Sequence, residues 1–327
     1  EKNDSYYGRG TTDTEIDATT AHKKSYEHFT LDLSVPGTVQ TGTIAGDGSL
    51  VLKLFFKRNV YDVTFVSDGE TIETQPVKYG ATAAAPNPAP TKAGYDLDGW
   101  YLNDEAFDFT TAIEGNIQLT AKWTARDDTK YTVEHYQEQL DGTYVLADTD
   151  KLEGTTDTEA VAAERSYDDF TVDKTVEGTL ASGNIAGDGS LVLKLYYTRN
   201  TYTYEVRHIK QLPDGTYDEA NAEVENLSGK FEAIATVNAK DYGSHYPVND
   251  ADEKQNVQIK KGLVIEVHYD LDEHTLTFDA KGGTETDSVT VRHGNTVAKP
   301  EDPKRSGYRF TGWFDDEKCR EKHNFDV

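Results

Sequence analysis

Residues 44–59 read IAGDGSLVLKLFFKRN, and residues 185–200 read IAGDGSLVLKLYYTRN. The two stretches are identical at 13 of 16 positions, and two of the three differences exchange phenylalanine for tyrosine. An internal copy this close means that the chain is built from repeated units. One unit therefore has to be understood before any site is sought.

Each copy predicts a β-hairpin whose second strand closes a module. The Asp-Gly dipeptide in each copy favours a tight turn, because glycine adopts positive φ without strain and aspartate tolerates it. The residues after the turn alternate, so leucines at every second position share one face of the strand. These are Leu50, Leu52 and Leu54 in the first copy and Leu191, Leu193 and Leu195 in the second.

Composition limits the class of protein. The chain has 327 residues and a formal net charge of −26, so its surface repels phosphate polymers and we expect no nucleic-acid partner. Mean hydropathy is −0.71. No apolar run approaches the roughly 20 residues of a membrane-spanning helix, and we expect no insertion into a membrane. Cys319 is the only cysteine, which excludes a disulfide within the chain.

Recurring landmarks divide the chain into five modules of two kinds. GTTDTE at 10–15 recurs at 154–159, and YGATAAAP at 79–86 is paralleled by HGNTVAKP at 293–300. Since the chain starts and stops inside a repeat, we expect a monomeric fragment of a longer protein, with its first module lacking an opening strand and its last a closing one. The predicted modules span 1–59, 60–125, 130–200, 201–272 and 273–327.

Most segments predict strands. Alternation predicts strands at 61–66, 117–123 and 263–269. Proline at every second position predicts an extended edge or connector around 86–90. In the third module, Thr158 predicts the cap of a short helix over 159–164, because the residues that follow all tolerate a helix.

The second and fifth modules resemble the Listeria–Bacteroides repeat, also called the internalin B-type repeat. The motif that carries the resemblance is Gly-Tyr, three residues, then Gly-Trp and an aromatic residue. It is matched at Gly94, Tyr95, Gly99, Trp100 and Tyr101, and again at Gly307, Tyr308, Gly312, Trp313 and Phe314. The repeat's closing strand is matched by LTAKW at 119–123.

The third module resembles the mucin-binding-protein domain family, through YTVEHYQEQLDGTY at 131–144 and GDGSLVLKLYYTRN at 187–200. Residues 1–59 and 201–272 read as a truncated and a diverged copy. Both resemblances imply small β-grasp-like modules in cell-surface proteins, mostly of Gram-positive bacteria. The predicted fold class is therefore mainly β (α+β), as tandem small β-grasp-like modules in an elongated array.

Two tryptophans and three histidines are candidate residues for a sugar site and a metal site. Trp100 and Trp313 suit stacking on a sugar, but they lie in a core motif and we expect them to pack inside. We expect His135, His208 and His268 to be exposed or half-buried strand residues. They lie in two different modules, so a shared metal site would require modules to fold against each other.

Carboxylates and the one thiol are candidates for a calcium site and a catalytic nucleophile. Asp96, Asp98 and the run at 249–253 lack the spacing of a calcium loop, so we expect solvated loops, with calcium at a module junction as an alternative. Cys319 has His323 four residues away but no catalytic signature around it, and we expect a solvated thiol. An isopeptide crosslink stays a further alternative.

These observations favour a non-enzymatic repeat region of a bacterial surface adhesin, extracellular and either anchored to the cell wall or secreted. It would bind host mucin, glycan or matrix protein, extend a distal domain from the cell wall, or do both. The alternatives are a passive stalk without a ligand and an accessory region of a secreted enzyme. We predict no catalytic, cofactor-binding or metal-binding residue and no cofactor, and the sequence leaves the ligand-binding residues undefined.

Overall fold

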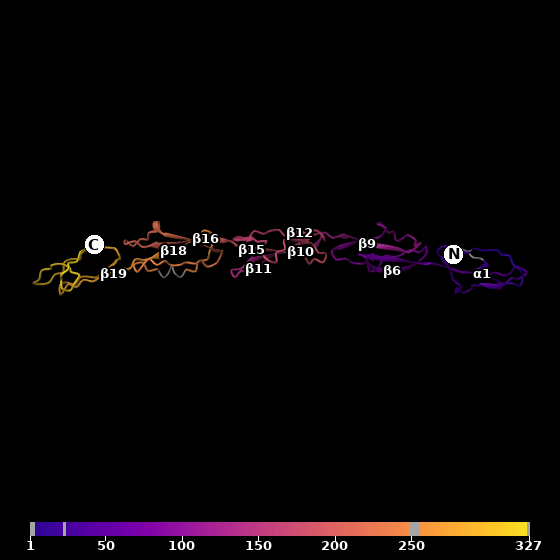
Figure 1. Ribbon diagram of the computed structural model, residues 1–327, viewed down its shortest axis with the longest axis horizontal. Coiled ribbons are helices and arrows are strands. Elements are labelled where there is room, and N and C mark those ends of the chain that lie inside the picture. The colour runs from indigo at the N-terminus through magenta and orange to yellow at the C-terminus, as the bar shows by residue number, and fades with distance from the viewer. Residues whose placement is uncertain (1–3, 22–23, 249–254, 326–327) are drawn as a thin grey trace. The chain divides into compact units, whose positions relative to one another are not determined.

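The computed structural model describes residues 4–21, 24–248 and 255–325. The regular structure in these residues is almost entirely β, with helical turns only at α1 (Ala18–Ala21) and η1 (Glu219–Asn221) (Figure 1). The prediction of a mainly β chain with small sheets in tandem is confirmed.

The chain divides into two compact units, whose segments alternate over residues 134–193. The first unit comprises Glu1–Val133, Asp150–Val161 and Ser182–Leu193, and the second comprises Glu134–Thr149, Ala162–Ala181 and Lys194–Val327. The first to fifth modules below are the residue ranges predicted from the sequence, 1–59, 60–125, 130–200, 201–272 and 273–327.

The first module carries short strands. β1 (Glu15–Asp17) pairs with β3 (Thr41–Thr43), and β2 (Phe29–Leu31) pairs with β4 (Phe56–Arg58), both antiparallel. Two-stranded ladders this short depend on side-chain packing more than on their backbone hydrogen bonds.

The second module is a five-stranded mixed sheet in the order β6-β5-β9-β7-β8. β5 pairs antiparallel with β6 and parallel with β9, so the first and last strands of the module lie side by side. The strands at 61–66 and 117–123 lie where the sequence predicts them. The strands are β5 (Val60–Ser67), β6 (Glu70–Lys78), β7 (Tyr95–Leu102), β8 (Glu105–Ala106) and β9 (Ile117–Ala125).

This sheet covers its own hydrophobic core. Trp100 is 5 % exposed and packs edge-on against Phe65, with ring centroids 4.8 Å apart at 81°. The other buried members also come from residues 60–125, namely Val63, Val77, Ala83, Ile113, Leu119 and Ala121.

The third module has a four-stranded sheet in the order β11-β10-β15-β13 and a separate pair, β12 with β14. β13 pairs antiparallel with β15, and β12 antiparallel with β14. The strands are β10 (Thr129–Glu138), β11 (Tyr144–Gly154), β12 (Glu159–Val161), β13 (Phe170–Val172), β14 (Ser182–Asn184) and β15 (Val192–Arg199).

The fourth module repeats the pairing of the second. β16 (Thr201–Lys210) pairs antiparallel with β17 (Glu223–Lys230) and parallel with β18 (Val264–Tyr269). Two modules predicted to be of different kinds thus share one central arrangement. The core again comes from the module itself: Tyr204, Val206, Ala235, Ile259, Leu263, Ile265, Val267 and Tyr269. In the fifth module, β19 (Glu273–Leu276) pairs antiparallel with β20 (Val289–Arg292).

The helix predicted over 159–164 is wrong, since residues 159–161 form strand β12. Ala160 and Ala162 are buried while Val161 between them is 68 % exposed. This period of two fits a strand, whereas a helix would bury residues three or four apart. The β14 edge supplies the hydrogen bonds, and residues with only a moderate helix preference follow that tertiary partner.

The repeated stretch behaves differently in its two copies. In the second, Leu193 and Leu195 are fully buried in strand β15, as predicted, whereas Leu191 precedes the strand and is half-buried. The predicted hairpin is wrong, because the strands on the two sides of the turn belong to different sheets: β14 pairs with β12, and β15 pairs with β10 and β13. In the first, only Phe56–Arg58 is regular strand. β15 has a neighbour on each side, whereas β4 pairs only with β2 among the described residues, and a strand with one short partner stays irregular.

Candidate functional site

Every junction between modules is built on the same pair of backbone hydrogen bonds. One linker residue donates its N–H to a carbonyl in the preceding module, and its C=O accepts an N–H from the following module. The linker residue donates its N–H in four bonds: Asn59 to the His28 carbonyl (2.8 Å), Arg126 to Gly94 (2.9 Å), Asn200 to Asp169 (2.9 Å) and Asp272 to His245 (3.0 Å). The linker carbonyl accepts an N–H in four more: Asn59 from Tyr79 (2.8 Å), Arg126 from Thr156 (2.9 Å), Asn200 from Phe231 (2.8 Å) and Asp272 from His293 (3.0 Å).

The Asn59 and Asn200 junctions also match in their side chains. Thr30 donates its hydroxyl to Asn59 Oδ1 at 2.6 Å, and Thr171 donates to Asn200 Oδ1 at 2.7 Å. In both, the preceding arginine reaches into the next module: Arg58 Nη1 donates to the Tyr79 carbonyl at 3.1 Å, and Arg199 Nη1 donates to the Phe231 carbonyl at 3.2 Å. The Arg-Asn dipeptide of the repeated stretch is thus a docking element.

The Asn200 junction contains a buried carboxylate. Glu138, 5 % exposed, accepts the backbone N–H of Arg199 at 2.9 Å and forms an ion pair with Lys230. Burial opposes the charged form of Glu138, but the hydrogen bond from Lys230 and the N–H of Arg199 outweigh it and lower its pKa. Each end of this ion pair belongs to a different module.

The Arg126 junction brings two glycines into contact. Thr156 donates its hydroxyl to the Gly94 carbonyl at 2.8 Å, and Tyr95 donates to the Asp157 carboxylate. A Cβ on Gly94 would lie 2.4 Å from the Gly187 Cα, so only glycine permits this approach.

The Asp272 junction gathers three imidazoles and one carboxylate. Asp272 Oδ2 lies 3.1 Å from His245 Nδ1 and 3.2 Å from His274 Nε2. The rings of His245 and His293 stack with centroids 3.8 Å apart at 15°. Asp272 is half-buried and the three histidines are exposed. These four residues are called the His3Asp cluster below. Among the residues that the structure describes, their donor atoms form a group that could hold a metal ion.

Charge in this cluster favours an ionised Asp272. Burial opposes the charged form, but the hydrogen bond from His245 and the charges of the neighbouring imidazoles outweigh it and lower the Asp272 pKa. The carboxylate is therefore available as an anionic ligand at neutral pH.

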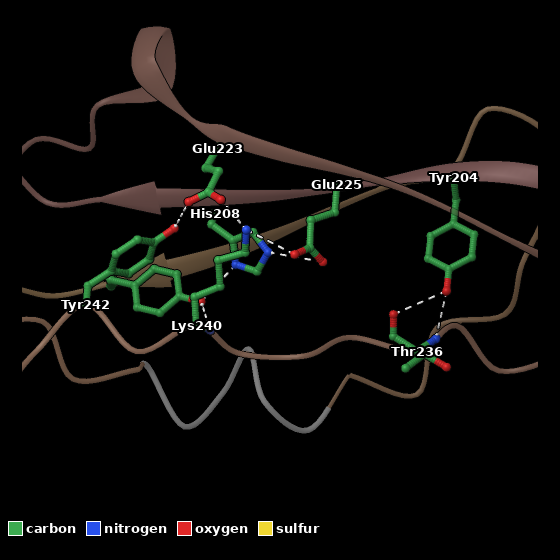
Figure 2. A network of polar contacts seen from close by, with 8 residues as sticks. Tyr204, His208, Glu223, Glu225, Thr236, Lys240 and Tyr242 are labelled. Carbon is green, nitrogen blue, oxygen red and sulfur yellow. Dashed lines mark hydrogen bonds and ion pairs between the residues drawn. The ribbon is translucent and has the colours of Figure 1, made fainter.

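A second polar network lies inside the fourth module (Figure 2). His208 Nδ1 lies 2.8 Å from the Tyr269 hydroxyl, which also accepts the backbone N–H of Lys240 at 2.7 Å. The Lys240 ammonium contacts Glu223 and, at 3.0 Å, Glu225. Side chains from two strands and a loop thereby close over the buried imidazole.

The charges of this network fix its protonation. Burial lowers the pKa of His208, although the carboxylate of Glu225 acts against it, so the imidazole is neutral at pH 7. The hydrogen bonds that Lys240 donates to Glu223 and Glu225 raise the pKa of Lys240. Burial followed by the hydrogen bond to Glu223 raises the pKa of Tyr242. Each of these shifts moves the pKa of its group further from neutrality.

The third module contains the same arrangement. His135 Nδ1 lies 3.0 Å from the Tyr197 hydroxyl, which accepts the Arg165 backbone N–H at 2.9 Å. Tyr167 donates to Asp148 at 2.6 Å, as Tyr242 donates to Glu223. A polar core group that recurs in successive modules is structural, because an active site is normally unique.

The predicted exposure of His135 and His208 is therefore wrong: they are 0 % and 1 % exposed. The tyrosine hydroxyl supplies the hydrogen bond that allows a neutral imidazole to be buried. His268 is half-buried in β18, as expected.

Replacing Tyr269 by phenylalanine tests this interpretation. The change removes one hydroxyl from a fully buried ring and takes a partner from both His208 and the Lys240 N–H. We expect a loss of about 1–3 kcal/mol in the unfolding free energy of the fourth module, measured by urea titration. Tyr308→Phe is the matched control, because Tyr308 is 69 % exposed, and we expect it to be neutral. An unchanged midpoint for Tyr269→Phe would show that the hydroxyl is dispensable.

The other predicted residues lie apart from both networks. Trp100 and Trp313 are buried, which confirms core packing over sugar stacking. Asp96 and Asp98 are exposed, and their partners are Arg126 and the Tyr101 hydroxyl. Cys319 is exposed in a tight turn. The acidic run at 249–253 lies outside the described residues.

The His3Asp cluster is not visible in the sequence, from which no metal-binding residue is predicted. Its members are separated by up to 48 positions and belong to two modules. One signal was present: HGNTVAKP parallels YGATAAAP, which places His293 at the position of Tyr79. The similarity of these two runs places His293 at a junction, but it does not indicate which residues contact His293 there.

Two segments of the chain, residues 61–122 and 274–327, match the model of the Listeria-Bacteroides repeat domain. The resemblance of these segments to that repeat is confirmed. The resemblance of residues 130–200 to mucin-binding-protein domains stays a prediction.

Two curated relatives come from Evansella cellulosilytica. One, named as a presumed Gly-rich membrane protein, is 24 % identical over 278 residues and covers 82 % of this chain. The other, named as a presumed membrane protein, is 20 % identical over 274 residues and also covers 82 %. The chain spans 31 % and 30 % of their lengths, so it corresponds to a part of each relative.

Among solved structures, the Bacillus anthracis TIE protein matches 75 % of this chain and 58 % of its own at 11 % identity, with a TM-score of 0.25. That score is too low to support a statement about fold. In the part of the chain that the structure describes, no helix has the length and apolar character needed to cross a membrane.

Proposed function

We propose that this chain is a non-enzymatic spacer segment of a bacterial surface protein, which holds other parts of that protein at a set distance from the cell. The observation that carries the proposal is the pair of backbone hydrogen bonds that recurs at all four junctions. A linker residue bonded on both sides has little freedom, so successive modules are coupled and do not hang on flexible tethers.

Further observations support this proposal. Two segments match a repeat domain, and two relatives are named as membrane proteins, which supports a surface location. The chain spans less than a third of each relative, which leaves room for other parts of such a protein. A net charge of −26 keeps an exposed array soluble and apart from other copies. The polar networks are repeated core features, which favours a structural role over catalysis.

Binding to host mucin, glycan or matrix protein is the second candidate. It is supported by the resemblance of residues 130–200 to mucin-binding-protein domains. Many glycans that coat host mucins are themselves acidic, and a chain of charge −26 is repelled by them. We therefore rank the spacer first. The accessory region of a secreted enzyme is the third candidate.

Small-angle X-ray scattering tests the spacer directly. Five end-to-end modules of roughly 28 Å reach about 140 Å and give a radius of gyration of about 40 Å, whereas a compact chain of this length gives about 20 Å. We expect a value near the larger one. A value near 20 Å would contradict the spacer. Retention on immobilised mucin, compared with bovine serum albumin of similar acidity as the control, would favour the second candidate.

A further inference from the structure

We propose that the His3Asp cluster at the Asp272 junction binds one divalent transition-metal ion, with zinc as the expected occupant. The donor atoms of His245, Asp272, His274 and His293 all lie within 4.8 Å of one another. The inference goes beyond the spacer and stands on the geometry of this junction alone.

The spacing of the donors fits zinc. Zinc bonds to histidine nitrogen and carboxylate oxygen measure about 2.0–2.2 Å, so two ligands on a tetrahedron lie about 3.4 Å apart. Asp272 Oδ2 is 3.1 Å from His245 Nδ1 and 3.2 Å from His274 Nε2. The widest pair, within 4.8 Å, has to close by up to about 1.4 Å, which side-chain rotation of an exposed histidine permits.

The chemistry of the donors selects the class of metal. Three imidazoles and one carboxylate suit zinc, nickel or copper, whereas calcium and magnesium prefer ligand sets made of oxygen. Four protein ligands also complete a tetrahedral shell, which is the composition of a structural zinc site. Because the three histidines are exposed, an ion reaches the site from solvent without any opening of the fold.

The Asn200 junction shows that these four positions need no histidine for folding. Around Asn59 they hold His28, Asn59, Tyr61 and Tyr79, and around Asn200 they hold Asp169, Asn200, Tyr202 and Phe231. His28 stacks on Tyr79 at 4.2 Å and 13°, much as His245 stacks on His293. Ring stacking is therefore a feature shared with the Asn59 junction. What differs at the Asp272 junction is that aspartate replaces asparagine and that two histidines, His274 and His293, replace tyrosine or phenylalanine.

The position of the site predicts its effect. His245 and Asp272 belong to the fourth module, and His274 and His293 belong to the fifth. A bound ion would therefore tie two modules together through side chains, in addition to the two backbone hydrogen bonds of Asp272. An ion that binds only the folded state stabilises that state, so the free energy of unfolding of both modules should rise when the ion is present.

Isothermal titration of the metal-free chain with zinc chloride tests the proposal, paired with thermal unfolding at each zinc concentration. We expect one zinc ion per chain and a rise in the unfolding midpoint of residues 201–325. The decisive variant combines His245→Asp, Asp272→Asn, His274→Tyr and His293→Phe. It installs the residues of the Asn200 junction, a set that the chain already folds without a metal, and it should abolish both effects.

Two single variants complete the design. Asp272→Asn keeps the backbone bonds and copies Asn59 and Asn200, and it should weaken zinc binding by at least about tenfold. His323→Ala is the control, because His323 pairs with Asp315 away from the junction, and it should bind zinc as the parent does. The proposal fails if the parent takes up no stoichiometric zinc, if binding survives the fourfold variant, or if His323→Ala abolishes it.

Discussion

Replacing Trp100 by alanine should unfold the second module while the fourth stays folded. Trp100 is 5 % exposed and packs on Phe65 at the centre of a core drawn only from residues 60–125. Removal of a buried tryptophan side chain costs about 3–5 kcal/mol. A module of about 65 residues has a total stability of roughly 3–10 kcal/mol. The loss is therefore a large share of what holds the module together.

Hydrogen exchange read by mass spectrometry separates the modules in one measurement. We expect peptides from β5 and β9 to lose protection and peptides from β16 and β18 to keep it, because the two modules have separate cores. Val60→Ala is the matched control, since Val60 begins the same sheet but is 54 % exposed, and it should leave every peptide protected. Simultaneous loss of protection in both modules would refute separate cores.

Replacing Gly187 by alanine should open the Arg126 junction. A Cβ at this position would lie 2.2 Å from the Ala93 carbonyl oxygen and 2.9 Å from the Ala93 carbonyl carbon, which are backbone atoms and cannot rotate away. We expect the hydrogen bonds of Arg126 and Thr156 to break, at a cost of about 1–3 kcal/mol for the junction. Amide exchange at these two residues, followed by nuclear magnetic resonance, should then accelerate by about tenfold to 100-fold.

The repeat itself supplies the control. Gly46 occupies the same place in an identical run, IAGDGS, but a Cβ there would meet only Thr12 Cγ2 at 3.6 Å, an ordinary contact. Gly46→Ala should leave amide exchange at Arg126 and Thr156 unchanged. Equal effects of the two substitutions would mean that the loss comes from the loop's own backbone and not from contact with Ala93.

Short sequence patterns predicted much of the local structure correctly. Leu193 and Leu195 are buried as their alternation predicts, the predicted turn at Asp188-Gly189 forms with its glycine at positive φ, and Trp100 lies inside. These features depend on residues next to one another in the chain, whose periodicity and φ preferences are visible in the sequence. The predictions failed where a distant partner decides, as in residues 159–161, which became a strand because β14 lies beside them.

The sequence by itself determined that the chain is a series of small β modules with buried leucine, tyrosine and tryptophan side chains. Tertiary structure alone decided how the modules are joined. In two identical runs, Gly46 lies near only a side chain, whereas Gly187 lies against another stretch of backbone, and four residues far apart in sequence meet at Asp272. The physical reason is distance along the chain. Side-chain alternation and turn formation depend on residues that are close in sequence, whereas a junction depends on contacts between residues that are far apart in sequence.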